Sequence, residues 1–236
     1  SRFKPTDADF ENNFNLSFFT ENNIKLLVTV GGDDTASTAN RIAKFLEAKK
    51  YPIANIHVPK TIDNDLVGTD HTPGFGSAAK YISVVMQEIL RDTAVYTVKA
   101  VTVVEIMGRD AGWLTASTAI GRVVGGLAPD YVYLPERTFS MEQFFADVRA
   151  ALEKHPNVVI AVSEGVRFAD GRYVCEGIGV ESTDAFGHKQ LSGTGKALEL
   201  AVKAEIGCKV RSIELNLPQR CAAHIASVQD LTESVS

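Results

Sequence analysis

Two adjacent aspartates follow a pair of glycines at the end of a short apolar run. Gly31 and Gly32 end the run, and Asp33 and Asp34 come directly after them, just before a helical pattern. Glycine suits such a bend because it tolerates a positive φ, and a strand that leads into a helix leaves backbone N–H groups able to bind an anion. A bare anion site would exclude carboxylates, so the aspartates indicate a phosphate that arrives with a divalent metal ion. Alone, the segment is equally typical of an acidic turn that caps a helix.

Charged or glycine-rich segments also follow three other predicted strands. The segment 59–66 (PKTIDNDL) follows one strand, 107–109 (MGR) a second and 163–165 (SEG) a third. In open α/β sheets, ligands bind at the edge where the carboxyl ends of the strands meet. We therefore expect these segments to contribute to a ligand site.

Together these segments offer the groups that phosphoryl transfer requires. The reaction needs a metal-held phosphate, cations on the transferring group, a base for the attacking hydroxyl and groups that position the acceptor. A glycosidase would need two carboxylates and no clustered cations, and a dinucleotide-binding dehydrogenase would need a GxGxxG that these loops lack. The candidate residues are Asp33, Asp34, Lys60, Thr61, Asp63, Asp65, Arg109, Glu164, Arg211 and Arg220.

Length and composition are those of a globular protein with one large or two modest domains. The chain has 236 residues, is 45% hydrophobic and 22% charged, and carries a net charge of −5. This charge disfavours nucleic-acid binding through diffuse positive charge. Its 3 cysteines have neither metal-ligand spacing nor the even number of a disulfide framework, which favours a reducing cytoplasm. We find no apolar run near the length of a membrane span, so we expect no membrane contact.

Short apolar runs alternate with helical patterns along the chain. Residues 24–30 form a run long enough for a strand buried on both faces, and Phe10, Phe14 and Phe18 share one face of a predicted N-terminal helix. Alternating strands and helices indicate an α/β fold with a parallel sheet covered on both sides. The other predicted strands cover residues 53–58, 101–106, 131–134, 158–162 and 210–215, and the main helices carry Ala39–Leu46, Ala79–Leu90, Ser140–Lys154 and Leu198–Val202.

The joint order of the motifs resembles the phosphofructokinase family, in its pyrophosphate-dependent branch. The resemblance runs from about Gly31 to Arg220 and rests on GGDD (31–34), PKTIDND (59–65), TDHTPGFGSAAKY (69–81), MGRDAGWL (107–114), SEG (163–165) and QRCAAH (219–224). It implies two Rossmann-like, three-layer α/β domains with mostly parallel sheets and an active site in the cleft between them. Residues 1–77 with 219–236 would bind the phosphoryl donor, and residues 78–218 would bind fructose 6-phosphate.

The resemblance also implies a reaction and its central residues. Pyrophosphate would phosphorylate the C1 hydroxyl of fructose 6-phosphate, a reversible step of glycolysis. Asp33 would hold Mg²⁺, and Asp63 would be the base that takes the proton of the C1 hydroxyl. Thr61 and Asp65 would flank this base and hold the sugar.

Further residues would bind the acceptor. Met107, Gly108 and Arg109 would contact substrate, with Arg109 also meeting the charge of the transition state, while Glu164 would accept hydrogen bonds from sugar hydroxyls. Arg220 would bind the 6-phosphate.

Three more positions match substrate contacts of the family. Arg211 would also bind the 6-phosphate, although on a strand it could instead pair with a nearby carboxylate. Lys80 and Tyr81 match a pair that reaches the site of a neighbouring subunit, which implies a homodimer or a higher homo-oligomer.

Two positions select the phosphoryl donor. Gly31 and Gly32 would bind it through the backbone, whereas Asp34 would stand where the α-phosphate of ATP must lie and would repel it. Lys60 adds a cation that can stabilise the transferring group. Both positions often carry glycine in ATP-dependent relatives, so they favour pyrophosphate. The alternatives are an ATP-dependent 6-phosphofructokinase and a catalytically silent regulatory subunit, although such a subunit would be expected to lose Asp33 or Asp63.

The chain departs from the family pattern at several points. We find no counterpart of the first glycine-rich loop, and the chain stops at Ser236, so we expect a part of a longer enzyme and do not expect turnover from these residues by themselves. Leu217 stands where relatives often carry His or Tyr. Ala100 stands where ATP-dependent relatives place an arginine donated across the subunit interface, although Lys99 is adjacent.

Overall fold

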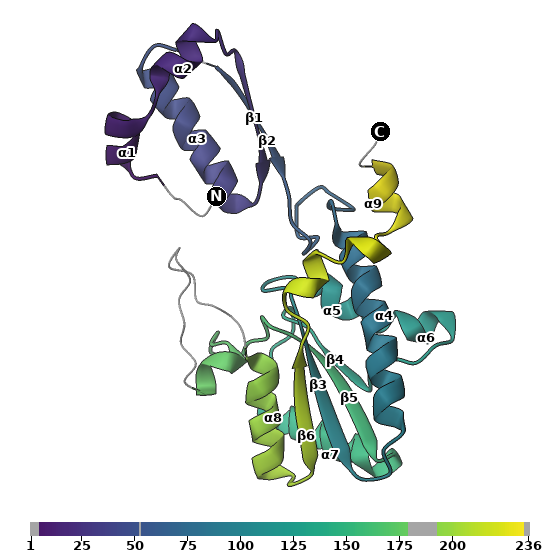
Figure 1. Cartoon of the computed structure of the whole chain (residues 1–236). Coiled ribbons are helices and arrows are strands. Elements are labelled where there is room, and N and C mark those ends of the chain that lie inside the picture. The colour runs from purple at the N-terminus through teal and green to yellow at the C-terminus, as the bar shows by residue number, and fades with distance from the viewer. Residues whose placement is uncertain (1–4, 52, 179–192, 234–236) are drawn as a thin grey trace. The chain divides into compact units, whose positions relative to one another are not determined.

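The computed structural model describes residues 5–51, 53–178 and 193–233 (Figure 1). The chain divides into two compact units, with the boundary between Thr61 and Ile62. The family resemblance places a boundary at residue 77 and groups 219–236 with the first domain, whereas residues 62–77 and 219–233 lie in the second compact unit. The loop expected over 168–195 lies partly outside the described residues.

In its described residues, the first unit contains a parallel pair of strands and three helices. In order these are α1 (Asp7–Asn13), α2 (Leu16–Glu21), β1 (Leu26–Gly31), α3 (Asp33–Ala48) and β2 (Ala54–Pro59). The strands pair from Leu26 opposite Ala54 to Gly31 opposite Pro59. Since α3 connects the two parallel strands and buries Ala39 and Leu46, this unit has the β–α–β connectivity that the alternating pattern predicts.

One face of the β1–β2 pair is exposed, which contradicts the expectation that residues 24–30 are buried on both faces. Val28 is 51% exposed and Val30 65%, while Leu27 and Thr29, which alternate with them, are partly buried. Successive side chains of a strand point to opposite faces, and α3 contacts the two strands from one side. Within the described residues of this unit, helices cover one face of the strand pair.

The predicted N-terminal aromatic helix is two short helices. Helix α1 ends with Phe14 as its C-cap, in an extended conformation. The Asn15 side chain then caps α2 by accepting a hydrogen bond from the backbone N–H of Phe18. Phe10 is buried and Phe14 packs edge-on against Phe45 of α3 at 5.1 Å, whereas Phe18 is 53% exposed. The three aromatic residues thus do not share one buried face.

The second unit is a three-layer α/β fold, as predicted. Its sheet has four parallel strands in the order β4-β5-β3-β6, and helices lie on both of its faces (Figure 1). Its regular elements are α4 (Phe75–Ala94), β3 (Ala100–Ile106), α5 (Trp113–Ser117), α6 (Ile120–Val124), β4 (Tyr131–Tyr133), α7 (Met141–Lys154), β5 (Asn157–Ser163), α8 (Thr194–Glu205), β6 (Lys209–Glu214) and α9 (Val228–Glu233), with short 3₁₀ turns at Val174–Ile178, Leu217–Arg220 and Ala223–Ile225.

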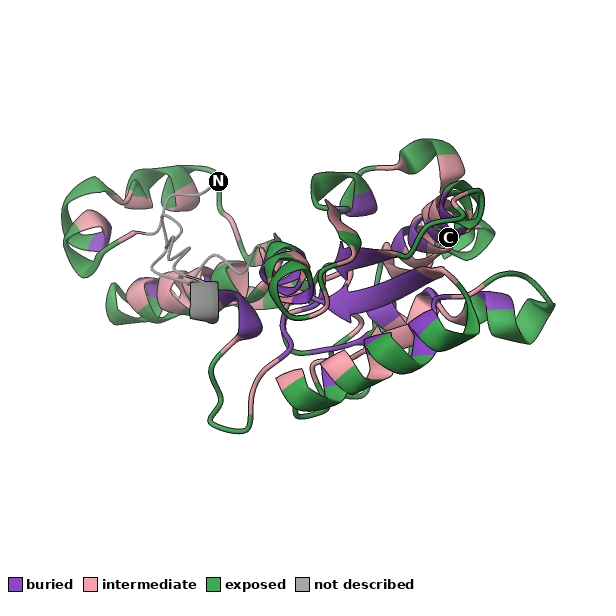
Figure 2. Ribbon diagram, turned by 90° about the horizontal axis from the view of Figure 1, so that it is seen from below, coloured by how far each residue is buried: buried purple, intermediate pink, exposed green. Residues whose placement is uncertain are grey.

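Both faces of this sheet are buried. Val101 and Val103 of β3 join the cluster made with α7 and α8, while Val104 and Ile106 join the cluster made with α4 and α5. Figure 2 shows the central strands buried and the outer faces of the helices exposed. Two covered faces require the near-continuous apolar runs of β3 and β5, which is why sequence alone located these strands well.

We expect Phe144→Ala in α7 to destabilise the second unit by about 3–5 kcal/mol, because Phe144 is fully buried and its removal leaves a cavity. Phe18→Ala, at an exposed position of α2, is the matched control and should change stability little. Urea unfolding of both variants measures the difference. Equal losses for the two variants would contradict this assignment of the core.

Candidate active site

The two candidate donor loops lie side by side at the carboxyl ends of β1 and β2. The backbone N–H of Lys60 donates to the carbonyl oxygen of Gly31 at 2.8 Å, directly after the last strand pair. The loop that carries Asp33 and Asp34 and the loop that carries Lys60 are therefore joined within the first unit. The structure brings Gly31, Asp33, Asp34 and Lys60 to one strand edge, as the sequence predicts.

Gly31 is needed for space and not for a positive φ, which corrects the sequence-based reason, whereas a Cβ on Gly32 would make only an ordinary contact, 3.8 Å from the carbonyl oxygen of Lys60. Gly32 has φ −80°, and Gly31 is not among the glycines with positive φ. A Cβ on Gly31 would lie 2.4 Å from Oγ1 of Thr35 and 2.8 Å from its Cβ. The first turn of α3 thus packs directly against the strand end.

Asp33 and Asp34 form the first turn of α3, so the helix begins before Thr35 and not after it as expected. Gly32 is its N-cap and offers no side-chain cap, and both aspartates are exposed. Carboxylates in a first turn interact favourably with the partial positive charge of the helix end. Their oxygens are also the ligand type that Mg²⁺ prefers, and Mg²⁺ commonly takes only one or two carboxylates and completes its shell with water and substrate phosphate. The donor set therefore fits a magnesium-bound phosphate.

A second strand edge joins three candidate segments in the second unit. β5, β3 and β6 are neighbours, and SEG, MGR and the QR of 219–220 follow their carboxyl ends. Glu164 accepts a hydrogen bond through Oε1 from the backbone N–H of Gly108 at 3.2 Å, and Gln219 accepts one from that of Met107 at 3.0 Å. Ser163 donates to the carbonyl oxygen of Gly108 at 2.5 Å. The three loops are thus hydrogen-bonded to one another.

Two glycines permit this close approach. Gly108 has φ +130°, and a Cβ there would lie 2.4 Å from the carbonyl oxygen of Ala111. A Cβ on Gly165 would lie 1.7 Å from the carbonyl oxygen of Arg109. Because both neighbours are backbone atoms, a side chain at Gly165 would push the MGR and SEG loops apart, and one at Gly108 would distort the turn from Gly108 to Ala111.

Glu164 has a strongly perturbed acidity. Burial raises its pKa to about 7, which the hydrogen bond from Gly108 opposes. The charge of Asp63 raises this pKa further, and those of Arg109 and Arg220 lower it. Asp63, Arg109 and Arg220 therefore each act electrostatically on Glu164, and a carboxyl group whose pKa lies near neutral among charged neighbours is typical of a functional site.

Glu105 is a site-adjacent residue that the sequence analysis missed. It is buried in β3, where it accepts a hydrogen bond from the backbone N–H of Gly195 at 2.6 Å. Burial raises its pKa to about 7. With Glu164 and Glu214 it lines a cavity of about 30 Å³, which has room for a water molecule. A single acidic residue inside the apolar run 101–106 was the available signal.

The TIDND segment forms a turn held by Asn64, which sequence reasoning also missed. Asn64 has φ +57°, its Oδ1 accepts a hydrogen bond from the backbone N–H of Thr72 at 2.9 Å, and its Nδ2 donates to the carbonyl oxygen of Asp70 at 3.2 Å. Asp63, just before it, is partly buried and Asp65, just after it, is exposed. Thr61 is the last residue of the first unit, so the motif crosses the boundary between the units.

Lys80 and Tyr81 lie in the second turn of α4. Lys80 is exposed and donates to the carbonyl oxygen of Ala226 at 3.1 Å, while Tyr81 packs against the core cluster shared by α4 and β3. The structure does not bring Arg211 to the Glu164 edge. Arg211 lies opposite Thr102 in β3, 3.7 Å from Asp92 and over the ring of Tyr96, which is the carboxylate pairing left open by the sequence.

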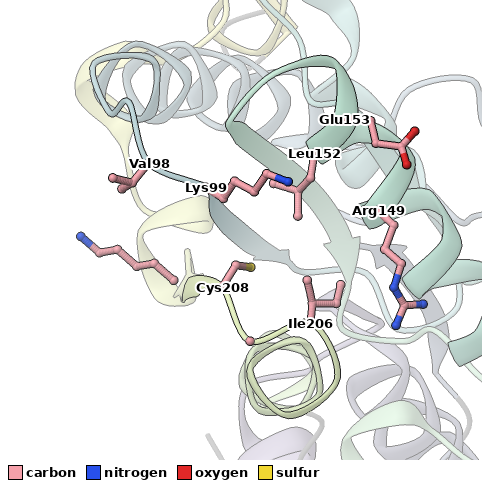
Figure 3. Close-up of a pocket in the computed structure, with 9 residues that line it drawn as sticks. Val98, Lys99, Arg149, Leu152, Glu153, Ile206 and Cys208 are labelled. Carbon is pink, nitrogen blue, oxygen red and sulfur yellow. The ribbon is translucent and has the colours of Figure 1, made fainter.

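A larger hollow, of about 640 Å³, lies at the amino ends of β3 and β6 (Figure 3). Lys99, Arg149 and Cys208 line it together with apolar side chains such as Leu152. It contains none of the candidate site residues. We assign the chemistry to the smaller carboxyl-end site in spite of this difference in size, because the candidate charges converge there. Ala100 begins β3 beside this hollow, at the end opposite Met107.

The sequence of this chain is similar to those of one protein family and of several curated proteins. Residues 1–214 match the family described as Phosphofructokinase. The chain is 41% identical to "Pyrophosphate--fructose 6-phosphate 1-phosphotransferase" of Xanthomonas campestris over 217 residues, covering 91% of this chain and 51% of that protein. It is 33% identical to "Sulfofructose kinase" of Alkalicoccus urumqiensis over 222 residues, covering 94% of this chain and 56% of that protein. The chain thus spans about half the length of these curated relatives.

Solved structures give the same result. The pyrophosphate-dependent phosphofructokinase of Nitrosospira multiformis matches with a TM-score of 0.77 at 33% identity, over 99% of this chain and 54% of that one. The enzyme of the same title from Marinobacter aquaeolei matches with a TM-score of 0.75 at 30% identity, over 99% and 54%. No helix in the described ranges is both long enough and apolar enough to cross a membrane.

We expect the raised pKa values of Glu105 and Glu164 to make stability fall with rising pH. Each carboxyl group has its pKa raised from 4.5 to about 7 in the folded state, so its protonated form stabilises the fold below pH 4.5 and this contribution is lost as the pH rises to 7. Glu105→Gln should flatten the fall between pH 4.5 and 7 by about 1–3 kcal/mol. Urea unfolding across this range measures it, and Glu153→Gln, at an exposed position, is the control. An unchanged slope in Glu105→Gln would contradict the assignment.

Proposed function

This chain belongs to the phosphofructokinase family, and we propose that it transfers a phosphoryl group from pyrophosphate to the C1 hydroxyl of fructose 6-phosphate. The products are fructose 1,6-bisphosphate and phosphate. The observation that carries the proposal is the hydrogen bond between Lys60 and Gly31, because it joins the loop of Asp34 to the loop of Lys60 at one strand edge. The names of the similar proteins support the same donor and acceptor.

The carboxyl edge of β5, β3 and β6 binds the acceptor sugar in this proposal. Glu164 accepts hydrogen bonds from sugar hydroxyls, and Arg220 pairs with the 6-phosphate. Arg109 meets the negative charge that develops during transfer. The effects of the Arg109 and Arg220 charges on the pKa of Glu164 support the assignment.

Asp63 removes the proton from the C1 hydroxyl as this oxygen attacks phosphorus. The effect of its charge on the pKa of Glu164, the proposed sugar contact, supports this role. The turn fixed by Asn64 holds it, and Thr61 and Asp65 flank it and position the sugar. General-base catalysis by a positioned carboxylate contributes roughly 10²–10⁴-fold to such reactions.

Asp33 holds Mg²⁺ together with the phosphates of the donor. The ion, when bound, neutralises charge on the donor phosphates and on the transferring group. Gly31 and Gly32 let these phosphates approach the first turn of α3. Asp34 excludes the α-phosphate of a nucleotide by charge, and Lys60 stabilises the phosphate that leaves when pyrophosphate gives up its phosphoryl group.

A second candidate acceptor is a sulfofructose, because one similar protein is named sulfofructose kinase. A sulfonate carries less charge than a phosphate dianion. Leu217, three positions before Arg220, is exposed and apolar, so it offers no positive charge to bind the second negative charge of a phosphate dianion. Fructose 6-phosphate remains the primary proposal, since several of the similar proteins are named for it.

We also propose a homo-oligomer in the cytoplasm. A hollow of about 470 Å³ between α4 and α6 is lined by the exposed side chains of Val84, Ile120 and Val124, next to Lys80. An apolar surface beside a residue expected to reach a neighbouring site favours contact with a second copy. The free Cys175, Cys208 and Cys221 suit a reducing compartment.

Asp63→Asn should lower kcat by roughly 10²–10⁴-fold while largely keeping fructose 6-phosphate binding, because the amide keeps the size of the side chain but cannot accept the proton. Steady-state kinetics and sugar-phosphate titrations measure the two effects. A drop of only a few-fold would remove Asp63 from the mechanism.

Purified protein containing this chain should form fructose 1,6-bisphosphate with pyrophosphate and not with ATP, in assays run side by side.

Asp34→Gly should gain some ATP use and keep part of the pyrophosphate rate, and Asp34→Gly with Lys60→Gly should lose pyrophosphate activity. Equal use of ATP by the unaltered protein would show that Asp34 does not select the donor. Faster turnover of sulfofructose than of fructose 6-phosphate would reassign the acceptor. A lack of activity with both pyrophosphate and ATP would indicate a silent subunit.

A further inference from the structure

The N-terminus of α4 is capped by a residue from the far end of the chain. Its own N-cap is Gly74, in the left-handed region with φ +88°, and offers no side chain. Asp230, in α9, accepts hydrogen bonds instead from the backbone N–H groups of Gly74 at 3.0 Å and Ser77 at 2.6 Å, and from Oγ of Ser77 at 2.5 Å. A carboxylate here satisfies N–H donors that lack partners within the helix and faces its partial positive charge.

Asp230 is itself held in place. The Ser227 hydroxyl donates to it at 2.8 Å, and the backbone N–H of Ser227 donates to Oγ of Ser77 at 2.9 Å. Burial alone would raise the pKa of Asp230, but its hydrogen bonds with Ser77, Ser227 and Gly74 together keep that pKa below its usual value. The carboxylate is therefore favoured in its charged, hydrogen-bonded form.

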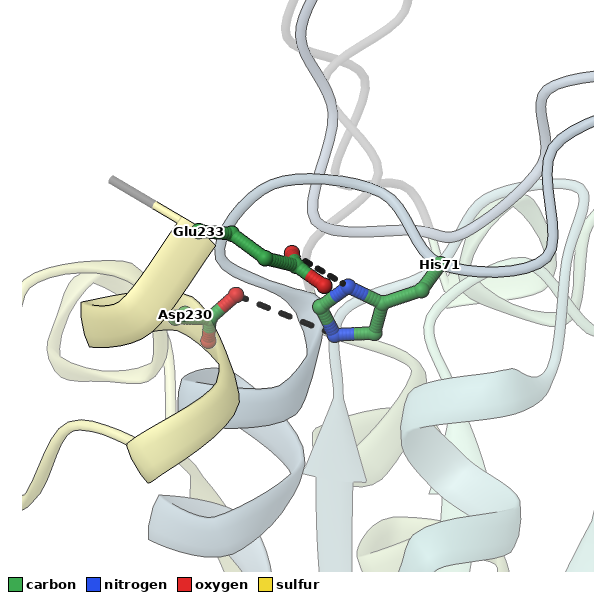
Figure 4. Close-up of side chains that lie close together, drawn as sticks. All are labelled: His71, Asp230 and Glu233. Atoms are coloured by element: carbon green, nitrogen blue, oxygen red, sulfur yellow. Dashed lines mark ion pairs between the residues drawn. The ribbon is translucent and has the colours of Figure 1, made fainter. Parts of the chain in front are cut away.

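His71 connects this cap to the loop before α4 (Figure 4). Its Nε2 lies 3.7 Å from Oδ1 of Asp230, and its Nδ1 lies 3.3 Å from Oε2 of Glu233 (Figure 4). The side chains of His71 and Asp230 are only 18% and 11% exposed. A Cβ on Gly76 would lie 2.9 Å from Oγ of Ser227 and 3.1 Å from Nε2 of His71, so glycine leaves room for the whole arrangement.

The three ligand-type side chains do not form a good metal site. Their atoms lie within 4.8 Å of one another, but the two carboxylates face different ring nitrogens and Asp230 already accepts several hydrogen bonds. One metal ion could use only one nitrogen of His71. The geometry instead suits an imidazole held between two carboxylates.

The chain on both sides of His71 is tied to the proposed catalytic turn. Asn64 hydrogen-bonds to Asp70, just before His71, and to Thr72, just after it. Asn64 directly follows Asp63. A continuous series of contacts therefore runs from Asp230 through His71 and Asn64 to Asp63, all within the second unit.

We propose that Asp230 is a positioning residue for phosphoryl transfer, which acts through His71 and Asn64 on the carboxylate of Asp63. The inference rests on the proposed function, since it takes Asp63 as the base. Asp230 touches neither substrate. It fixes the orientation of the turn that carries Asp63.

The decisive test is a double-mutant cycle in the protein that contains this chain. Asp230→Asn keeps the size of the side chain but loses its charge, and should lower kcat about tenfold with a smaller change in KM for the sugar phosphate. In an Asp63→Asn background the same change should cost kcat almost nothing more, because no base remains to be positioned. Equal losses in both backgrounds would show a merely structural role and overturn the proposal.

The chain supplies a matched control pair. Asp130 also faces a histidine, His155, at 2.8 Å, and also accepts a backbone hydrogen bond, from Val159 at 2.9 Å, but at the amino ends of the strands. Asp130→Asn should leave kcat unchanged. A tenfold loss there as well would overturn the assignment of the effect to the Asp230 contacts.

Hydrogen exchange tests the proposal independently of any activity. Asp230→Asn should raise amide exchange rates about tenfold in residues 62–77 and leave those of residues 141–163 unchanged, because the lost charge loosens the cap and the turn together. His71→Gln should do the same for residues 62–73. Unchanged exchange would overturn the positioning role even if the proposed reaction is confirmed, whereas altered exchange in a protein without the reaction would locate the failure in the proposed function.

Discussion

The hydrogen bond from the backbone N–H of Gly108 to Glu164 joins two neighbouring parallel strands at their carboxyl ends. It can form only because β5 and β3 pair in register up to Ser163 and Ile106, and because Gly165 lets the backbone of Arg109 approach. The loop after β6 completes the edge through Gln219. The proposed acceptor site therefore depends on the order of strands in the sheet, which places three separate motifs in contact.

This edge is also where the sequence was most informative. Motifs such as MGR and SEG directly follow apolar runs, and the rule that parallel strands share a carboxyl edge was enough to bring them together. Sequence did less well where the fold uses long-range contacts. Glu105 and Asn64 act through partners in other elements, and Asp230 caps a helix from 156 residues away, as the separation of its hydrogen bond with Gly74 shows. No local pattern records such a partner.

The errors have physical causes of the same kind. Positive φ was the expected reason for Gly31, whereas crowding by Thr35 explains it, and crowding is a property of the packed helix. The exposed face of β1 was missed because an apolar run does not say whether a second layer covers it. Arg211 matches a position that binds the 6-phosphate in the family, yet its neighbours here are Asp92 and Tyr96.

Proton exchange on sugar binding tests most directly whether the Glu164 edge is the acceptor site. Because burial raises the pKa of Glu164 to about 7, a sugar hydroxyl that donates to its carboxylate should release protons when fructose 6-phosphate binds at pH 7. Calorimetry in buffers of different ionisation enthalpy counts these protons. The account predicts a release that Glu164→Gln abolishes and Glu153→Gln keeps. Tight binding with the same proton exchange in Glu164→Gln as in the unaltered protein would contradict it.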